Sequence, residues 1–141
     1  MAKITVPLQM LDLHGDGFHP LLDIQIFDKT FKVVLDTGAS RTAFDRDLLL
    51  AANAEADIVS SGRLSTGLGT NSMESATAAI SNVHIGDLLI DEIEVAVLDL
   101  STINIAYREL GHPEVLGVIG SDILMKYKAV IDFGKKVLVL K

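Results

Sequence analysis

The stretch VVLDTGAS, residues 33–40, contains the feature that decides how the chain folds. Apolar, β-favouring residues run directly into Asp36, Thr37 and Gly38, so a buried strand ends at a carboxylate. An isolated Asp-Thr-Gly most often forms only a turn, in which the aspartate accepts a hydrogen bond from its own backbone. Here a strand delivers the acid, and the glycine lets another chain or a ligand approach the backbone closely. This context favours a functional carboxylate at the end of a strand.

Apolar and polar residues alternate around this stretch, which is typical of half-buried β-strands. Leu22, Ile24 and Ile26 predict a hairpin with strands over residues 21–27 and 31–35 and a polar break at Asp28 and Lys29. Further strands are predicted over residues 76–85, 88–98, 115–120, 129–132 and 137–140, and short helices over residues 45–53 and 121–127. Residues 99–114 show no regular pattern, and the glycine-rich residues 60–72 are expected to form a hairpin tip or loop. We therefore predict an all-β fold with one or two short helices, in a single domain over residues 1–141.

Composition and charge argue against several classes of protein. No apolar run approaches the roughly 20 residues that span a bilayer, although 49% of the residues are apolar and the mean hydropathy is +0.40. The net charge of −7 argues against nucleic acid and anionic membranes as partners. The sequence contains no cysteine, which removes disulfides, thiol nucleophiles and thiolate metal sites. The first residues lack the pattern of a secretory signal, so a cytoplasmic location is expected.

The chemistry open to Asp36 depends on a second carboxylate. Amide hydrolysis needs one group that activates water and another that protonates the carbonyl oxygen or the leaving nitrogen. Two carboxyl groups about 3 Å apart are known to share one proton, which provides both roles at once. The sequence contains no second Asp-Thr-Gly or Asp-Ser-Gly. The partner of Asp36 must therefore come from a second copy of the chain, which predicts a homodimer.

Four segments resemble, in order, the retropepsin-like aspartic proteases, which are small single-lobe enzymes that act as homodimers. HPLLDIQIFDKTFKVVLDTGAS resembles the hairpin and Asp-Thr-Gly-Ala loop of bacterial members, and RLSTGLGTNSMESA stands where the flap belongs. VLGVIGSDILMKYKAVIDF resembles the apolar-apolar-Gly motif with its helix and following strand, and KKVLVL resembles the last strand. The resemblance implies a closed β-barrel with one lobe per chain. It also implies an aspartic endopeptidase that hydrolyses peptide or protein substrates without a metal or cofactor.

The resemblance also assigns roles to individual residues. Asp36 would be the catalytic carboxylate, repeated by symmetry in the partner chain, and Thr37 would orient its loop. The substrate backbone would lie along Gly38 and Ala39. The remaining assignments are a flap tip made of Gly67, Leu68 and Gly69, and a support beneath the catalytic loop made of Val118, Ile119 and Gly120.

Two departures from the retroviral pattern leave alternatives open. Retroviral members usually carry Asp after Asp-Thr-Gly-Ala and Arg after the second glycine, where this chain has Ser40 and Ser121. The charged network that braces the retroviral dimer is therefore missing in that form, and the flap lacks the Ile-rich retroviral tip. One alternative is a catalytically inactive dimeric peptide-binding or assembly module of the same fold. Another is a monomeric β-domain that serves a larger complex.

Other motifs in the sequence are explained without a further site. Asp12, His14, Asp16 and His19 match no established metal-ligand spacing and are expected to belong to a loop. The Asp-Phe-Gly at residues 132–134 is expected to be a hairpin turn, because the other kinase motifs are missing. The glycine spacing of GVIGSD is not that of a dinucleotide-binding loop. His84 and His112 are interpreted as surface or turn residues.

Overall fold

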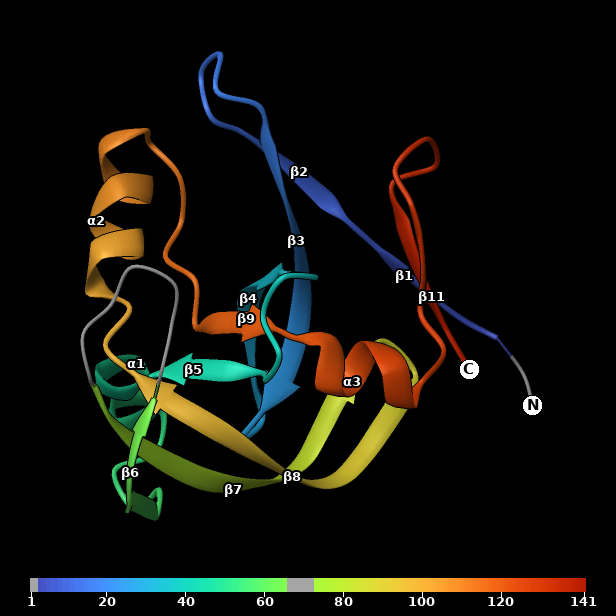
Figure 1. Ribbon diagram of the computed structural model, residues 1–141. Helices are drawn as coiled ribbons and strands as arrows, with labels where there is room; N and C mark the ends of the chain where they lie inside the picture. The colour runs from blue at the N-terminus through green and yellow to red at the C-terminus, as the bar shows by residue number, and fades with distance from the viewer. Residues whose placement is uncertain (1–2, 66–72) are drawn as a thin grey trace.

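A computed structural model describes residues 3–65 and 73–141 of the chain, which are mostly β-strand (Figure 1). The strands are β1 (Ile4–Pro7), β2 (Gln9–Asp12), β3 (Phe18–Ile26), β4 (Lys29–Leu35), β5 (Ala43–Asp45), β6 (Ile58–Ser65), β7 (Met73–Ile85), β8 (Leu88–Leu98), β9 (Gly117–Ile119), β10 (Val130–Asp132) and β11 (Val137–Leu140). The helices in the described part of the chain are α1 (Arg46–Ala52), α2 (Ser101–Glu109) and α3 (Ser121–Lys126). No helix of these residues is long and apolar enough to cross a lipid bilayer.

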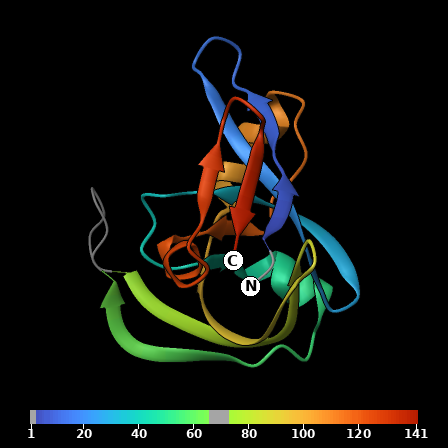
Figure 2. The same cartoon turned by 90° about the vertical axis from the view of Figure 1, so that its right-hand side faces the viewer.

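The strands form a barrel with a small sheet beside it. The larger sheet has eight strands in the order β2-β3-β4-β9-β5-β8-β7-β6, and an additional pairing between β3 and β7 closes a ring. A second sheet of three strands, in the order β1-β11-β10, joins the two ends of the chain. Figure 2 shows this smaller sheet next to α3. The all-β prediction and the closed barrel are thus confirmed.

The hairpin that leads to Asp36 forms because its alternating residues fit one register. β3 and β4 pair antiparallel with Leu22 opposite Val33, so the apolar side chains of both strands enter the barrel together. The two-residue turn consists of Phe27 and Asp28, both with positive φ (51° and 59°), as a tight hairpin with two left-handed residues requires. The turn therefore starts one residue earlier than the predicted polar break at Asp28 and Lys29.

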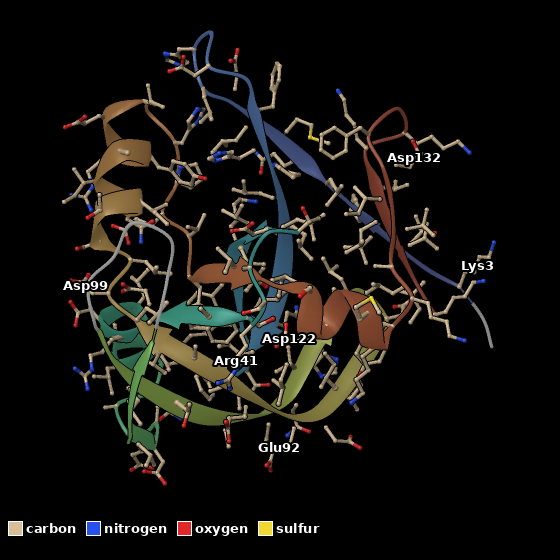
Figure 3. The ribbon with its side chains drawn as sticks, viewed as in Figure 1. Lys3, Arg41, Glu92, Asp99, Asp122 and Asp132 are labelled. Carbon is tan, nitrogen blue, oxygen red and sulfur yellow. The ribbon has the colours of Figure 1, made fainter. Side chains whose placement is uncertain are left out.

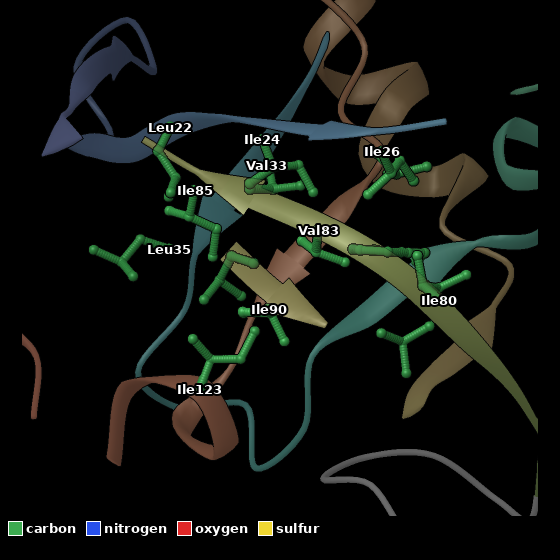
Figure 4. Packing of buried hydrophobic residues seen from close by; sticks show 14 of the residues in the cluster. Leu22, Ile24, Ile26, Val33, Leu35, Ile80, Val83, Ile85, Ile90 and Ile123 are labelled. Atoms are coloured by element: carbon green, nitrogen blue, oxygen red, sulfur yellow. The ribbon is translucent and has the colours of Figure 1, made fainter. Parts of the chain in front are cut away.

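The barrel interior contains the main hydrophobic core, to which every barrel strand contributes. Figure 4 shows its centre, where aliphatic side chains from β3, β4, β7 and β8 meet Ile123 of α3. A smaller cluster lies outside this core and consists of Leu11, Leu21, Val34, Tyr107 and Val115. The two clusters cover opposite faces of the β3–β4 hairpin, because neighbouring residues of a strand point to opposite sides. Leu35 belongs to the first cluster and Val34 to the second.

Strand β9 lies between β4 and β5 in the larger sheet and needs a glycine where it meets β5. It pairs parallel with β4 and antiparallel with β5. A Cβ atom on Gly117 would lie 1.9 Å from the carbonyl oxygen of Ala43, so no other residue fits without displacement of the backbone. The close approach of β9 to β5 is what brings the end of β9 against the end of β4.

The structure corrects the prediction for residues 99–114, where α2 forms. The helix has no side-chain cap at Leu100 and contains β-branched residues, so its sequence gives little local signal. Asn104, which is buried, fixes it instead: its side-chain amide donates to the carbonyl of Val115 (3.1 Å) and accepts from the amide of Val115 (2.8 Å). A contact between two residues that are eleven positions apart in the sequence therefore stabilises the helix.

Two further segments differ from the prediction. Strand β6 extends to Ser65, so the residues 60–65 expected in a hairpin tip or loop are part of a strand. Strands β1 and β2 had not been predicted; β1 pairs with β11 at the other end of the chain. β1 and β2 have only four residues each, and serines and a glycine interrupt the apolar pattern of β6, so neither pattern indicated a strand.

Candidate active site

Asp36 stands directly after β4, in a loop that the backbone holds firmly. Its amide donates to the carbonyl of Ile119 (3.0 Å), which extends the parallel pairing of β4 with β9 by one bond. Its carboxylate oxygen Oδ1 accepts from the amide of Gly38 (3.0 Å), and its carbonyl accepts from the amide of Ala39 (3.2 Å). Asp36 thus makes the local turn that an isolated Asp-Thr-Gly forms, but its side chain remains partly exposed at the end of a buried strand. Thr37 is exposed in the same loop.

The segment at residues 118–120 lies against the Asp36 loop. Val118 and Ile119 are the neighbours of Val34 and Leu35 in β4. Gly120 follows, and a Cβ atom there would lie 2.6 Å from the carbonyl carbon of Arg41. The amide of Ser121 donates to the carbonyl of Ala39 (2.8 Å). The fold therefore brings together the two sequence segments in which the catalytic and supporting residues were predicted.

The carboxylate of Asp122, which Figure 3 labels at the start of α3, and the hydroxyl of Thr42 hold these two segments together, and sequence reasoning missed both. Both carboxylate oxygens of Asp122 accept from the amide of Thr42 at 3.0 Å, and the Thr42 hydroxyl donates to Oδ1 at 2.9 Å. The same hydroxyl accepts from the amide of Gly120 at 3.1 Å. Thr42 is 1% exposed, so this network is buried where Asp122 enters it. The sequence placed Asp122 only within the predicted helix over residues 121–127, because its bond to Thr42 spans 80 positions.

On the side of the sheet that carries Asp36, α2 and the smaller hydrophobic cluster form an apolar wall, the α2 wall, which includes the polar side chains of Tyr107 and His19. Tyr107 of α2 packs with Val34, two residues before Asp36, and its hydroxyl lies 2.6 Å from Nδ1 of His19. Burial raises the pKa of Tyr107, and the negative charge of Asp36 raises it further. Tyr107 had not been singled out from the sequence, and His19 had been considered only as a metal ligand.

The predicted flap residues Gly67, Leu68 and Gly69 lie outside the described part of the chain. The last described pair of the hairpin that leads to them is Ser65 with Met73. Their assignment as a flap tip stays a prediction.

Residues 22–123, which include Asp36, Gly120 and Asp122, match the model of the family described as Aspartyl protease. The chain belongs to the aspartyl protease family. A search of curated protein sequences found no match. Among solved structures, this family member resembles a retropepsin-like aspartic protease from Rickettsia conorii, with 18% identity, a TM-score of 0.61 and coverage of 99% of this chain and 89% of the other.

Two further solved structures have the same fold. The EIAV protease complexed with the inhibitor HBY-793 is 18% identical, with a TM-score of 0.57 and coverage of 82% of this chain and 93% of the other. The retroviral protease-like domain of Ddi1 from Leishmania major is 15% identical, with a TM-score of 0.56 and coverage of 86% of both chains. At these identities the similarity shows the fold, which is the retropepsin-like barrel expected from the sequence resemblance.

Proposed function

We propose that this aspartyl protease family member is an endopeptidase in which the Asp36 carboxylates of two associated chains activate one water molecule. The observation that supports this most directly is the position of Asp36. It stands partly exposed at the end of a buried strand, and the backbone of Ile119, Gly38 and Ala39 fixes its loop. A rigid loop of this kind can present the carboxylate to an identical loop across a two-fold axis.

In the proposed reaction the two carboxyl groups share one proton. The ionised Asp36 takes a proton from the water as its oxygen attacks the peptide carbonyl carbon, while the protonated Asp36 gives its proton to the carbonyl oxygen. The tetrahedral intermediate then collapses: the C–N bond breaks, one carboxyl group protonates the nitrogen and the other takes back the hydroxyl proton. Water is consumed, and no metal or cofactor enters the balance.

The surface beside the loop supports the proposed association of two chains. Met125 of α3, Val130 of β10 and Phe133 in the following turn are 79%, 56% and 58% exposed. Met125 belongs to the helix nearest the Asp36 loop, because α3 begins at Ser121, whose amide donates to the carbonyl of Ala39. Strand β10 is an edge of its sheet and has unpaired backbone groups on one side. A second copy would cover these apolar side chains and bring the two Asp36 loops near one axis.

The substrate in this proposal is an extended peptide. Extended peptides bind by adding themselves as a strand, with main-chain hydrogen bonds for affinity and pockets for specificity. Apolar residues, among them Val34 and Val118, flank the Asp36 loop, so apolar side chains beside the cleaved bond are expected.

The test compares the parent protein with Asp36→Asn on a peptide library. We expect cleavage by the parent and a loss of at least about 100-fold in the variant, because Asn can neither take nor give the proton. Asp99→Asn is the matched control, since Asp99 also accepts the backbone amide two residues further on (Ser101, 2.9 Å) but lies in the turn before α2. Equal cleavage by the parent and Asp36→Asn would overturn the proposed role.

Mixing the two proteins tests whether each site needs both carboxylates. If parent and Asp36→Asn chains pair at random, an equal mixture retains about one quarter of its chain pairs as parent pairs, and activity falls accordingly rather than to one half. Retention of about three quarters, the share of pairs with at least one parent chain, would mean that one Asp36 is enough, and retention of one half would mean that each chain acts alone. A parent that binds peptides without cleaving them would support the inactive module, for which Ser40 and Ser121 are the motivating departures.

A further inference from the structure

His19 and Asp36 lie on the same face of the sheet. Leu21 pairs with Val34, and Val34 pairs with Val118, so these three residues form a row across β3, β4 and β9. The pairing of β3 with β4 ends at Leu21 and Val34, and His19 and Asp36 each stand two residues beyond that last pair. Residues two apart in a strand share a face. The imidazole and the carboxylate therefore lie on the same side of the row, beyond the last pair of β3 and β4.

Tyr107 connects this face to α2. Its side chain is 3% exposed and packs in the cluster that contains Leu21 and Val34. Its hydroxyl forms the 2.6 Å hydrogen bond with Nδ1 of His19, and it lies within electrostatic reach of Asp36. His19 itself is exposed. A buried residue therefore fixes an exposed imidazole beside the candidate active site.

The hydrogen bond persists in both charge states of the imidazole. Neutral His19 with its proton on Nε2 accepts a hydrogen bond from the phenol at Nδ1, whereas the imidazolium donates a hydrogen bond from Nδ1 to the phenol oxygen. Tyr107 keeps its proton at neutral pH, because its pKa is raised from an already high value. The position of the ring is thus retained while its charge changes, and histidine is the side chain whose charge changes between about pH 5 and 8.

The other titratable groups around this pair come from three further segments. His112, after α2, has its ring 6.5 Å from that of Tyr107, and its Nε2 donates to the carbonyl of Asp12. His14, in the turn after β2, has its ring 5.9 Å from that of His112. Arg108 and Glu114 neutralise each other at 2.9 Å. Within the described ranges, no group of three or more acidic or histidine side chains is arranged to hold a metal.

We infer that His19, positioned by Tyr107, is a specificity-determining residue that selects peptides with an acidic side chain near the cleaved bond when its imidazole is protonated. This inference rests on the proposed function for its substrate. A cation at this place attracts a peptide carboxylate, whereas the neutral imidazole offers only an uncharged hydrogen bond. The preference for acidic peptides should therefore strengthen as the pH falls.

The cleavage test uses two peptide libraries that are identical except for a Glu or a Gln at one fixed position. The peptide Glu is ionised at both about pH 5.5 and about pH 7.5. For the parent we expect the Glu-to-Gln ratio of kcat/KM to be about two- to fivefold higher at the lower pH, the size of an exposed ion pair. In His19→Gln the ratio should not change with pH, and in Tyr107→Phe the change should be smaller because the imidazole is no longer held. His84→Gln, an exposed histidine of β7, is the matched control and should behave as the parent.

A binding test separates this inference from the proposed chemistry. In the Asp36→Asn background, dissociation constants of the Glu and Gln libraries are measured at the same two pH values, with and without His19→Gln. A pH-dependent preference for Glu that disappears with His19→Gln supports the inference even if the parent cleaves nothing. A ratio that is the same with and without His19 overturns the inference, both in binding and in cleavage, and leaves the role of Asp36 untouched.

Discussion

At the scale of single residues, Tyr107 connects the burial of a side chain to the charge of the candidate active site. Burial makes the phenolate form costly, and the Asp36 carboxylate adds electrostatic repulsion; both raise the pKa of the phenol. A raised pKa means that the folded protein keeps the Tyr107 proton in a range where the unfolded chain loses it. The contribution to stability is therefore present below about pH 10 and is lost as the pH rises through the pKa of the folded state.

The prediction at this scale is that Asp36→Asn lowers the pKa of Tyr107, while most of the shift caused by burial remains. Ultraviolet absorbance of the phenolate measures it in a Tyr127→Phe background, where Tyr107 is the remaining tyrosine of the sequence. Asp132→Asn, which removes a charge elsewhere, should leave the titration unchanged. An identical titration of Tyr107 with and without the Asp36 charge would contradict the electrostatic contact between the two residues.

At the scale of elements, α2 depends on a single buried amide. The Asn104 side chain satisfies both backbone groups of Val115 just before β9 begins, and it thereby ties the helix to the strand that supports Asp36. Tyr107, on the same helix, covers the row of side chains on β4 and β9. The position of the α2 wall beside the candidate site is thus set by hydrogen bonds rather than by apolar packing alone.

Asn104→Leu should therefore destabilise the protein by about 1–3 kcal/mol per backbone group left unsatisfied, although leucine has a similar volume. Urea unfolding measures this change. Thr102→Leu is the matched control, because it places the same side chain at an exposed position of the same helix and should change stability by less than about 0.5 kcal/mol. Equal effects of the two substitutions would show that the Asn104 bonds contribute nothing specific.

At the scale of the whole molecule, the proposed enzyme is complete only as a pair of chains. Helix α3, which carries the exposed Met125, begins next to the Asp36 loop, and the Thr42–Asp122 network stabilises that loop inside each chain. In retroviral members, charged residues usually stand at the positions of Ser40 and Ser121. Here the Thr42–Asp122 network stabilises the Asp36 loop within one subunit instead. Association is then expected to depend mainly on apolar contact.

Met125→Glu should accordingly shift the protein from a dimer to a single chain and abolish cleavage, because a charge is costly in an apolar interface. Light scattering would report a mass near that of one 15.1 kDa chain for the variant and twice that mass for the parent. Ile105→Glu makes the same change at an exposed position of α2, 50% accessible, and should leave the mass of the dimer intact. A parent that cleaves peptides as a single chain would refute the shared site.

Local patterns predicted the parts of this fold that local interactions specify. The β3–β4 and β7–β8 hairpins follow from strict alternation and two-residue turns. The Asp36 loop and the segment at residues 118–120 were likewise visible as short motifs. Contacts between distant residues were not visible in this way. Helix α2 depends on Val115, β1 pairs with β11, and Tyr107 bonds His19, which is 88 positions away. No period or motif encodes such a pairing in a single sequence.

The ring of strands closes at one short seam between β3 and β7, where Gln25 and His84 form a single ladder pair. Every other pair of neighbouring strands in the ring is joined by two or more residue pairs. Local opening of the barrel would begin at this seam. It lies at the far end of β3 from the row beside Asp36, so the barrel could open locally there while the Asp36 loop keeps its shape.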